Sequence, residues 1–486
     1  MARFAPSAAP KRLRRAALAI LALVVAGIGA MTIRATITVD AARAEVEESL
    51  SALTGVGLRL GGAATARLLP WPSVRFDDVF LTRRDDGRTV ATMASLDVSL
   101  DVAALLLGRL RPEELRLAHP EVHLSLDDAR PSIAAVVAAI AAWKPVSVTV
   151  EKGRFAVATA AGEEMLDTVD ARLSWPRPSA NLKLRAGFRW RGESIGFDLD
   201  GPSPIRLHAG ETGAASLRLT SAPLRLAFSG AAGLTSPVRF DGTGDVEIVD
   251  AARFARWSGL PRTRDLLTGR FRLDGRLTAD ARGATMPDAR LDAAGNKAEG
   301  ALTLRWDAAR PRLSGTIAFA ALDFTSGRRR PFGPGWPDLP LDRGGRSHDL
   351  DLRLSAPSVK LPSATLTRVA AALHVSEGRL RAEIGNAELF GKPISATLRG
   401  TLGDGGLEAQ IRAGGDEFPL ADIARLFAVP GVEAGRTSIN FDGETRCATL
   451  GACLAATTGH LRADARSAKV TGASPFADMS RFRPIV

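Results

Sequence analysis

The sequence predicts an all-β protein with a few short helices, in which a long, twisted antiparallel sheet forms the body. Short segments alternate between apolar and polar residues, as in Leu350-Asp351-Leu352-Arg353-Leu354. Such alternation is typical of strands with one apolar and one polar face. Gly, Pro, Asp and Asn separate these segments at short intervals, and few segments have helical spacing. At 486 residues and a mean hydropathy of +0.03, the chain is long enough for one large layered domain or two to three ordinary ones.

Residues 16–33 contain no charged residue and are about long enough to cross a bilayer as a helix. Lys11, Arg12, Arg14 and Arg15 precede them, and basic flanks stay on the cytoplasmic side. We therefore expect residues 1–15 in the cytoplasm, an anchor over 16–33 and an exported body. A cleavable signal peptide is the alternative, since Gly27 and Gly29 offer small residues. Its apolar core would usually run only about 7–15 residues, which favours the anchor.

The composition excludes several classes of protein. The net charge is +11, yet aromatic residues make up 5% of the chain and tyrosine is absent. No basic run alternates with stacking aromatics, which argues against nucleic-acid binding. The positive charge of an exported protein favours contact with anionic lipid headgroups. Arginines on the solvent faces of strands are the alternative explanation of the charge.

Two cysteines, Cys447 and Cys453, lie close together in the predicted exported part. Because an oxidising compartment favours pairing, the spacing predicts a local disulfide. Two free buried thiols are the alternative. With only His460 nearby, the pair lacks the ligands of a structural zinc site.

The first elements after the anchor are one helix and a series of strands. Val46, Leu50 and Leu53 share a face of a helix over 41–53, which Gly55 ends. The alternation then predicts strands over 74–81, 96–100, 115–117, 122–126 and 146–150, a buried helix over 134–143, a turn at 151–153 and a return strand from Phe155.

The rest of the chain is almost entirely strand. Short helices are expected over 251–257 and 420–427, and a segment rich in Pro, Gly and Arg reads as a linker. The predicted exported body therefore comprises a β region over 34–327, a linker over 328–348 and a second β region over 349–486.

Candidate sites for chemistry are weak. His119, Glu121 and His123 would share one face of a strand, but Pro120 interrupts it, so a solvated polar face explains them better than a metal site. The acidic pairs Asp198/Asp200 and Asp349/Asp351 alternate with leucine as outward strand positions. No serine stands in a G-x-S-x-G elbow. We expect no catalytic residue, no metal and no cofactor.

These segments together resemble the AsmA family of bacterial envelope proteins. The resemblance is most specific in the anchor, Thr54-Gly55, Leu69-Pro70-Trp71-Pro72 and Phe76-Asp77-Asp78-Val79. It continues through 105–108, 115–117, 120–122, a Gly-turn strand pair over 146–157, 310–313, 322–323, 336–341, 349–352, a hairpin at 388–391 and 443–464. Lys392-Pro393 and the tail 467–486 depart from the family pattern.

The resemblance implies a sheet that curls into an open trough with an apolar lining, as in the related TamB-like and bridge-like lipid-transfer proteins. It implies an inner-membrane protein with a periplasmic body that carries phospholipid acyl chains toward the outer membrane. Its implied partners are membrane phospholipids, the inner membrane and outer-membrane or periplasmic assembly proteins. Leu350, Leu352 and Leu354 are the candidate lipid-facing positions. The alternative is a closed core that serves as a scaffold or regulator of outer-membrane protein or lipopolysaccharide assembly.

Overall fold

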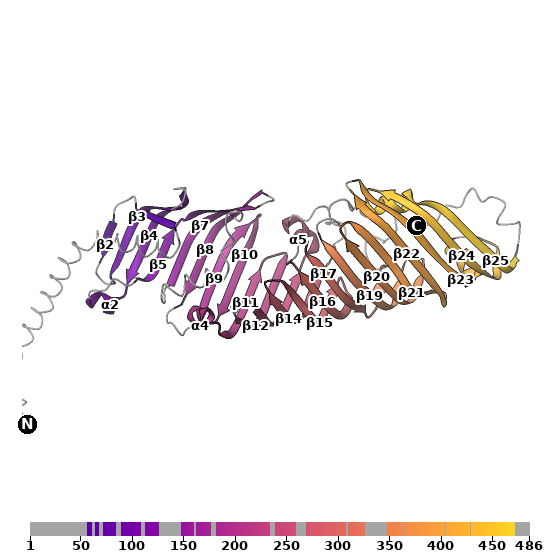
Figure 1. Cartoon of the computed structure of the whole chain (residues 1–486), viewed down its shortest axis with the longest axis horizontal. Helices are drawn as coiled ribbons and strands as arrows, with labels where there is room; N and C mark the ends of the chain where they lie inside the picture. Colours follow the sequence, from indigo (N-terminus) through magenta and orange to yellow (C-terminus); the bar gives the residue numbers. More distant parts are fainter. Residues whose placement is uncertain are drawn as a thin grey trace, which may run out of the picture. The chain divides into compact units, whose positions relative to one another are not determined.

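The computed structural model divides the chain into two units, residues 1–209 and 210–486, and each unit is described by itself. Figure 1 follows the strands of each unit along the chain. The structure describes residues 56–60, 64–67, 71–83, 89–107, 112–125, 147–159, 162–175, 181–233, 239–258, 269–307, 310–325, 348–361, 363–403, 405–427 and 429–471.

In its described residues, unit 1 is a sheet with two short helices. Its strands are β1 (Val56–Leu60), β2 (Ala64–Arg67), β3 (Ser73–Arg83), β4 (Thr89–Leu100), β5 (Pro112–Ala118), β6 (Glu121–Ser125), β7 (Ser147–Thr159), β8 (Gly162–Ser174), β9 (Leu182–Trp190) and β10 (Glu193–Gly201). Its helices are α2 (Val102–Leu106) and α4 (Pro204–His208).

The prediction of a turn at 151–153 followed by a return strand is wrong. Strand β7 runs without reversal from Ser147 to Thr159, pairing in parallel first with β5 and then with β6. Lys152 has a φ of 51°, so Glu151-Lys152-Gly153 forms an irregularity within one strand. The sequence pattern of a bulge and that of a turn are alike here, because both require a left-handed residue.

Strands β3, β4 and β5 carry the buried core of unit 1. Phe76, Val79 and Val98 are fully buried, and Leu96 and Leu115 pack with them. Leu96 and Val98 on β4 occupy alternate positions, as the alternation in the sequence predicts. Phe76 and Val79 on β3 are three residues apart, and Asp78 between them has a φ of 51°.

Unit 2 contains fifteen strands and three short helices within the described ranges. The strands are β11 (Thr212–Thr220), β12 (Leu224–Gly233), β13 (Arg239–Ile248), β14 (Phe271–Asp280), β15 (Gly283–Ala293), β16 (Asn296–Arg305), β17 (Arg312–Phe319), β18 (Leu322–Asp323), β19 (Asp349–Lys360), β20 (Thr365–Ser376), β21 (Arg379–Leu389), β22 (Lys392–Gly403), β23 (Gly406–Pro419), β24 (Val432–Cys447) and β25 (Thr458–Val470). The helices are α5 (Ala251–Ser258), α7 (Leu420–Leu426) and α8 (Leu450–Ala456).

Most neighbouring strands of unit 2 are antiparallel and follow one another along the chain. The exception corrects the expected all-antiparallel sheet, since β17 and β18 pair in parallel with β19. The predicted linker over 328–348 lies between β18 and β19, and the structure describes only its last residue, His348. Because the strands that flank it pair with each other, it connects neighbours in one sheet.

Tight turns set the register of several hairpins. Phe390 and Gly391, at the predicted hairpin, have φ values of 53° and 74°, and Glu377 and Gly378 have 53° and 79°. Two consecutive left-handed residues form the two-residue loop whose twist matches that of paired strands. Glycine takes this conformation without steric cost, which explains the X-Gly pairs in the sequence.

The structure confirms an all-β protein with few short helices. The expected helices at 251–257 and 420–427 are α5 and α7, whereas α2, α4 and α8 were not anticipated. The predicted anchor and the predicted helices at 41–53 and 134–143 lie outside the described residues. Among the helices that are described, none is long and apolar enough to cross a membrane.

Candidate functional site

The candidate lipid-facing leucines of β19 lie on one face of unit 2. Leu350, Leu352 and Leu354 are half-buried, whereas the intervening Asp351 and Arg353 are exposed. Since successive residues of a strand point to opposite faces, the three leucines form a column on the same side of the sheet.

This column belongs to apolar rows that run from strand to strand. In register with Leu352 are Gly315 on β17, Leu373 on β20 and Ala382 on β21. Gly315 lies in turn opposite Leu302 on β16. The row continues through Leu398 on β22 to Ile411 on β23. One adjacent row takes one residue from each of β16, β17, β19, β20 and β21, in the order Leu304, Leu313, Leu350, Val375 and Leu380. The row on the other side takes Gly300, Ile317, Leu354, Ala371 and Ile384 from the same strands. We call these rows the apolar face of unit 2.

Large side chains of the apolar face are mostly half-buried, which distinguishes them from a closed core. The half-buried members include Leu302, Leu313, Ile317, Leu350, Leu352, Leu354, Leu373, Ile384, Leu398 and Ile411. In unit 1, by contrast, the residues of the same kind on β3 to β5 are buried. A half-buried leucine row keeps part of its surface available to a ligand.

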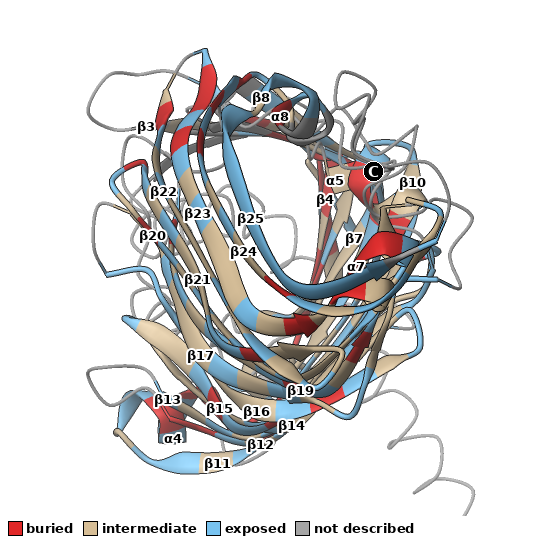
Figure 2. Ribbon diagram, turned by 90° about the vertical axis from the view of Figure 1, so that its right-hand side faces the viewer, coloured by how far each residue is buried: buried red, intermediate tan, exposed pale blue. Residues whose placement is uncertain are grey.

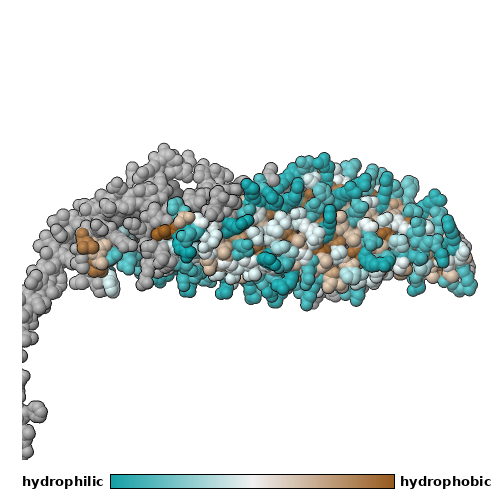
Figure 3. Space-filling view, turned by 60° about the horizontal axis from the view of Figure 1, so that its bottom comes forward, coloured by the Kyte–Doolittle hydropathy of each residue, from teal (hydrophilic) through white to brown (hydrophobic). Residues whose placement is uncertain are grey.

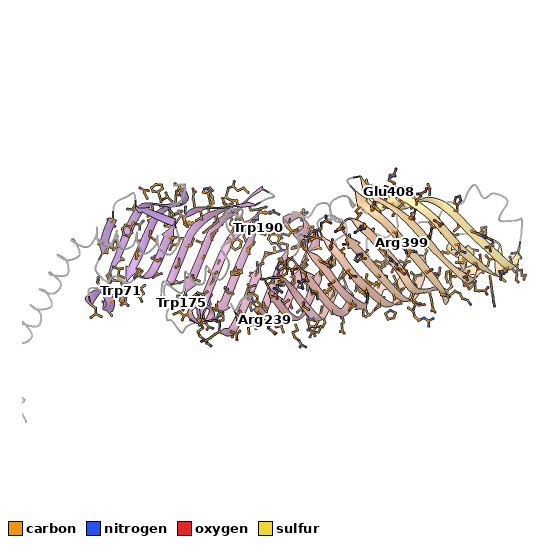
Figure 4. The ribbon with its side chains drawn as sticks, in the orientation of Figure 1. Trp71, Trp175, Trp190, Arg239, Arg399 and Glu408 are labelled. Carbon is orange, nitrogen blue, oxygen red and sulfur yellow. A yellow bond between two sulfur atoms is a disulfide. The ribbon has the colours of Figure 1, made fainter. Side chains whose placement is uncertain are left out.

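The opposite face of unit 2 is polar and charged. One row in register reads Asp351, His374, Arg381, Arg399 and Gln410, all of them exposed. Arg399 on β22 and the exposed Glu408 on β23 are labelled in Figure 4. Hydrophilic residues likewise predominate on the face of the molecule shown in Figure 3, with paler and more hydrophobic residues between them.

Ion pairs cross several strands on this polar face. Arg290 on β15 donates to Asp274 on β14, with Nε at 2.8 Å from Oδ2. Arg272 pairs with both Asp274 and Asp245 on β13, and Arg225 on β12 with Glu247 on β13. Exposed pairs of this kind contribute little to stability, so they chiefly mark the solvated side of the sheet.

Two helices lie at opposite ends of β24, as Figure 2 shows for the curved strands β23 to β25. α7 precedes β24 and buries Leu420, Ile423 and Ala424. Leu420 packs against Gly435, where an added Cβ would lie 3.0 Å from Leu420 Cδ2. α8 follows β24 at the other end. The helices therefore cover the two ends of β24 and leave its middle, at Ile439 and Phe441, half-buried.

A disulfide joins α8 to the end of β24. Cys447 and Cys453 are bonded in the structure, with their Cα atoms 4.9 Å apart, and both are buried. The Cys453 carbonyl accepts hydrogen bonds from Thr445 Oγ1 at 2.9 Å and Thr457 Oγ1 at 2.7 Å. Together with Val375, Leu402 and Leu407, the cystine forms a compact cluster. Leu350, Leu373 and Leu398 of the apolar face pack against this cluster.

A depression of about 570 Å³ lies across strands β16 to β21. Its lining includes three consecutive residues of β19, Arg353 to Ser355, and three of β20, Ala370 to Ala372. Gly300, Ile317, Leu354 and Ala371, which lie in one row of the apolar face, also belong to this lining.

Unit 1 has an apolar row of the same design. In register from β3 to β10 are Val74, Val98, Leu115, Val148, Leu173, Leu184 and Leu199. The row changes from buried on β3 to β5 to half-buried on β7 to β10. The alternation of apolar and polar residues within each strand is visible in the sequence. Only the pairing of the strands shows that their apolar residues form one row.

The charged side chains do not form a site for metal chemistry in the part of the chain that the structure describes. No group of three or more His, Cys, Asp or Glu residues stands close enough there to hold an ion. His119 has a φ of 50°, which breaks the two-residue alternation with Glu121 and His123.

One carboxylate has a strongly perturbed pKa. Glu164 accepts hydrogen bonds from Arg191 Nε at 2.9 Å and Trp190 Nε1 at 3.0 Å, which lower its pKa from 4.5 to about 2. Arg191 also lies over the Trp190 ring, 5.1 Å from its centroid. Figure 4 labels Trp190, on β9. These contacts connect β8 to the β9–β10 hairpin, and this structural role explains the lowered pKa of Glu164.

Comparison with known proteins identifies the N-terminal part of the chain. A sequence model described as the AsmA family matches residues 9–177, which include the predicted anchor and strands β1 to β8. No match to the chain is found among the curated proteins or the solved structures. The resemblance of residues 310–464 lies beyond the matched segment and stays a prediction. Residues 9–177 thus match the AsmA family, as the predicted anchor and the motifs around Trp71 and Asp77 indicated.

Proposed function

We propose that this protein is anchored in the bacterial inner membrane, lies in the periplasm and binds phospholipid acyl chains along its apolar faces. In this role it supports phospholipid transport to the outer membrane, or phospholipid homeostasis there. The observation that carries the proposal is the half-buried apolar face of unit 2, whose rows stay in register from β16 to β23. The family match over residues 9–177 supports it.

The apolar face has the chemistry that an acyl chain requires. Each methylene removed from water contributes about 0.8 kcal/mol, so a two-chain lipid can bind without a specific polar contact. Because adjacent strands lie about 4.8 Å apart, rows of leucine and isoleucine make a hydrophobic surface without polar gaps. The headgroup would remain in water beyond the strand ends.

We expect low selectivity for the headgroup. The charged residues of β19 to β22, including Arg353, Arg381 and Arg399, are exposed on the opposite face from the leucines. A phosphate held by the apolar face would therefore not meet these guanidinium groups. Lipids that differ only in headgroup should bind with similar affinity.

Photo-crosslinking in cells tests this proposal at single residues. A photoreactive amino acid is placed in turn at Leu350, Leu352 and Leu354, and at the intervening Asp351 and Arg353 as matched controls. We expect phospholipid adducts at the three leucine positions and none at the two polar ones, as measured by mass spectrometry of the purified protein.

The scaffold hypothesis makes the opposite prediction. If the apolar face were covered by protein, lipid adducts would be absent at all five positions, and protein adducts would replace them. Equal lipid labelling at leucine and polar positions would indicate non-specific contact with membrane and would likewise overturn the proposal.

A further inference from the structure

An exposed apolar tip stands at one end of unit 1. Trp71 is 71% exposed and Leu107 is 76% exposed, and Val102 at the start of α2 is 38% exposed. We call these three residues the apolar tip. Trp71 and Leu107 are the two most exposed large hydrophobic side chains in the described part of the chain. Exposure of most of a tryptophan side chain is unusual in the absence of a binding partner.

The pairing of β3 with β4 brings the three residues together. Ser73, two residues after Trp71, lies opposite Ser99, and Leu100 N donates to Pro72 O at 2.9 Å. α2 starts immediately afterwards, so Val102 and Leu107 lie at the same end of the sheet. Figure 4 labels Trp71 at the position that α2 occupies in Figure 1, which has the same orientation.

The tip is held by hydrogen bonds close to it. Asp101 Oδ1 accepts from Ala103 N at 2.9 Å and from Ala104 N at 3.2 Å, which fixes the start of α2. Leu107 N donates to Ala104 O at 3.1 Å and closes the helix. Its exposed side chains are therefore presented by an ordered structure.

We propose that the apolar tip inserts into the headgroup region of the bilayer that holds the predicted anchor. Tryptophan is enriched at membrane–water interfaces, because its ring is apolar and its indole N–H still finds water or headgroup oxygens. Leu107 and Val102 supply the apolar surface that enters the acyl boundary.

The chain lengths are compatible with this placement. The 22 residues from 34 to 55 separate the predicted anchor from β1 and span at most about 79 Å when extended. Strand β3 has 11 residues, or about 36 Å. The tip therefore lies within reach of the membrane. In the sequence, Arg109 and Arg111 follow Leu107, and such arginines favour anionic headgroups over the surface of another protein.

Fluorescence quenching in liposomes tests the insertion with the full chain. Leu107→Cys is labelled with an environment-sensitive dye and reconstituted into vesicles of phosphatidylethanolamine and phosphatidylglycerol. Thr89→Cys is the matched control, since Thr89 is exposed at the opposite end of β4, about 40 Å along the 12-residue strand. Nitroxide-labelled lipids should quench the dye at position 107 and leave that at position 89 unaffected, whereas aqueous iodide should do the reverse.

A second substitution tests whether the tip itself drives contact. Trp71→Ala in the Leu107→Cys background should reduce lipid quenching severalfold, whereas Met165→Ala, at an exposed apolar residue outside the tip, should not. Equal iodide access at positions 107 and 89 would overturn the proposal. Lipid quenching at position 107 should persist in the Leu352→Asp variant, which alters only the apolar face of unit 2. Loss of lipid binding by that face is therefore distinguishable from loss of tip insertion.

Discussion

Leu352 on β19 lies directly opposite Leu373 on β20, and both side chains are half-buried on the apolar face. One residue further, Arg353 lies opposite Ala372 on the polar face, and both are exposed. A register shift of one residue on either strand would place a leucine opposite a charged or polar neighbour. The continuity of the apolar face therefore depends on correct pairing at each ladder.

Charge on the apolar face should reduce lipid binding. We expect Leu352→Asp to lower the phospholipid that co-purifies with the protein at least about threefold, because a buried carboxylate is costly beside acyl chains. Arg353→Asp, at the next position on the opposite face, is the matched control and should retain the wild-type amount. Lipid per mole of protein is measured by mass spectrometry; equal losses in both variants would contradict the assignment of faces.

The membrane topology predicts the activity of C-terminal fusions. With residues 1–15 in the cytoplasm and 16–33 as an uncleaved anchor, alkaline phosphatase fused after Val486 should be active in cells. A reporter that works only in the cytoplasm should be inactive at the same point. The reverse pattern would exclude a periplasmic body, and a shortened N-terminus in the mature protein would indicate signal-peptide cleavage.

The cystine at α8 should be visible by thiol trapping. Alkylation of the unfolded protein should label neither Cys447 nor Cys453 before reduction and both afterwards. Replacement of both cysteines by serine should destabilise the α8 region by about 2 kcal/mol, the loop-closure contribution of so short a loop. Hydrogen exchange in 447–457 measures this loss. Labelling of two thiols without reductant would rule out the disulfide.

A side chain at Gly300 should disturb the ladder between β16 and β17. Gly300 lies opposite Ile317, and an added Cβ would overlap the Thr316 carbonyl oxygen, which as backbone cannot move aside. We expect Gly300→Ala to destabilise unit 2 by about 1–3 kcal/mol.

Gly187 on β9 provides the control for this substitution, because nothing lies within 4 Å of a Cβ added there. Gly187→Ala should change the denaturation midpoint little. Urea titrations of both variants, followed by circular dichroism, distinguish the two cases. Similar midpoints for the two proteins would indicate that strand β16 adapts to the added methyl group.

The Glu164 cluster predicts a stability loss in acid. Since hydrogen bonds from Arg191 and Trp190 lower the pKa of Glu164 from 4.5 to about 2, its contribution to stability is complete above about pH 4.5. That contribution is lost as the pH falls toward 2, where the carboxylate becomes protonated in the folded state as well.

Glu164→Gln should therefore destabilise unit 1 at pH 7 and make little difference near pH 2. Urea midpoints of the wild type and the variant at the two pH values test this sign. Glu163→Gln, at the adjacent exposed position on β8, is the control. A wild-type and variant difference that grows on acidification would contradict the assigned role of Glu164.

The sequence by itself determined the class of fold and the character of each strand. The alternation in 350–354 predicted that its leucines share one face and its charges the other, because the two-residue period is a local property of an extended chain. Turn residues such as Gly391 are local signals as well. The close spacing of Cys447 and Cys453 similarly needed no tertiary information to suggest a pair.

The tertiary structure alone decided which strands are neighbours and which faces are covered. The parallel pairing of β17 with β19 across 326–347, and the passage of β7 along both β5 and β6, depend on contacts that no local pattern encodes. Whether an apolar row is a closed core, as at Phe76, or a half-buried surface, as at Leu352, depends on what packs against it. The alternation of apolar and polar residues is the same in both cases. It depends on the direction of each side chain and not on whether a second layer of protein covers the sheet.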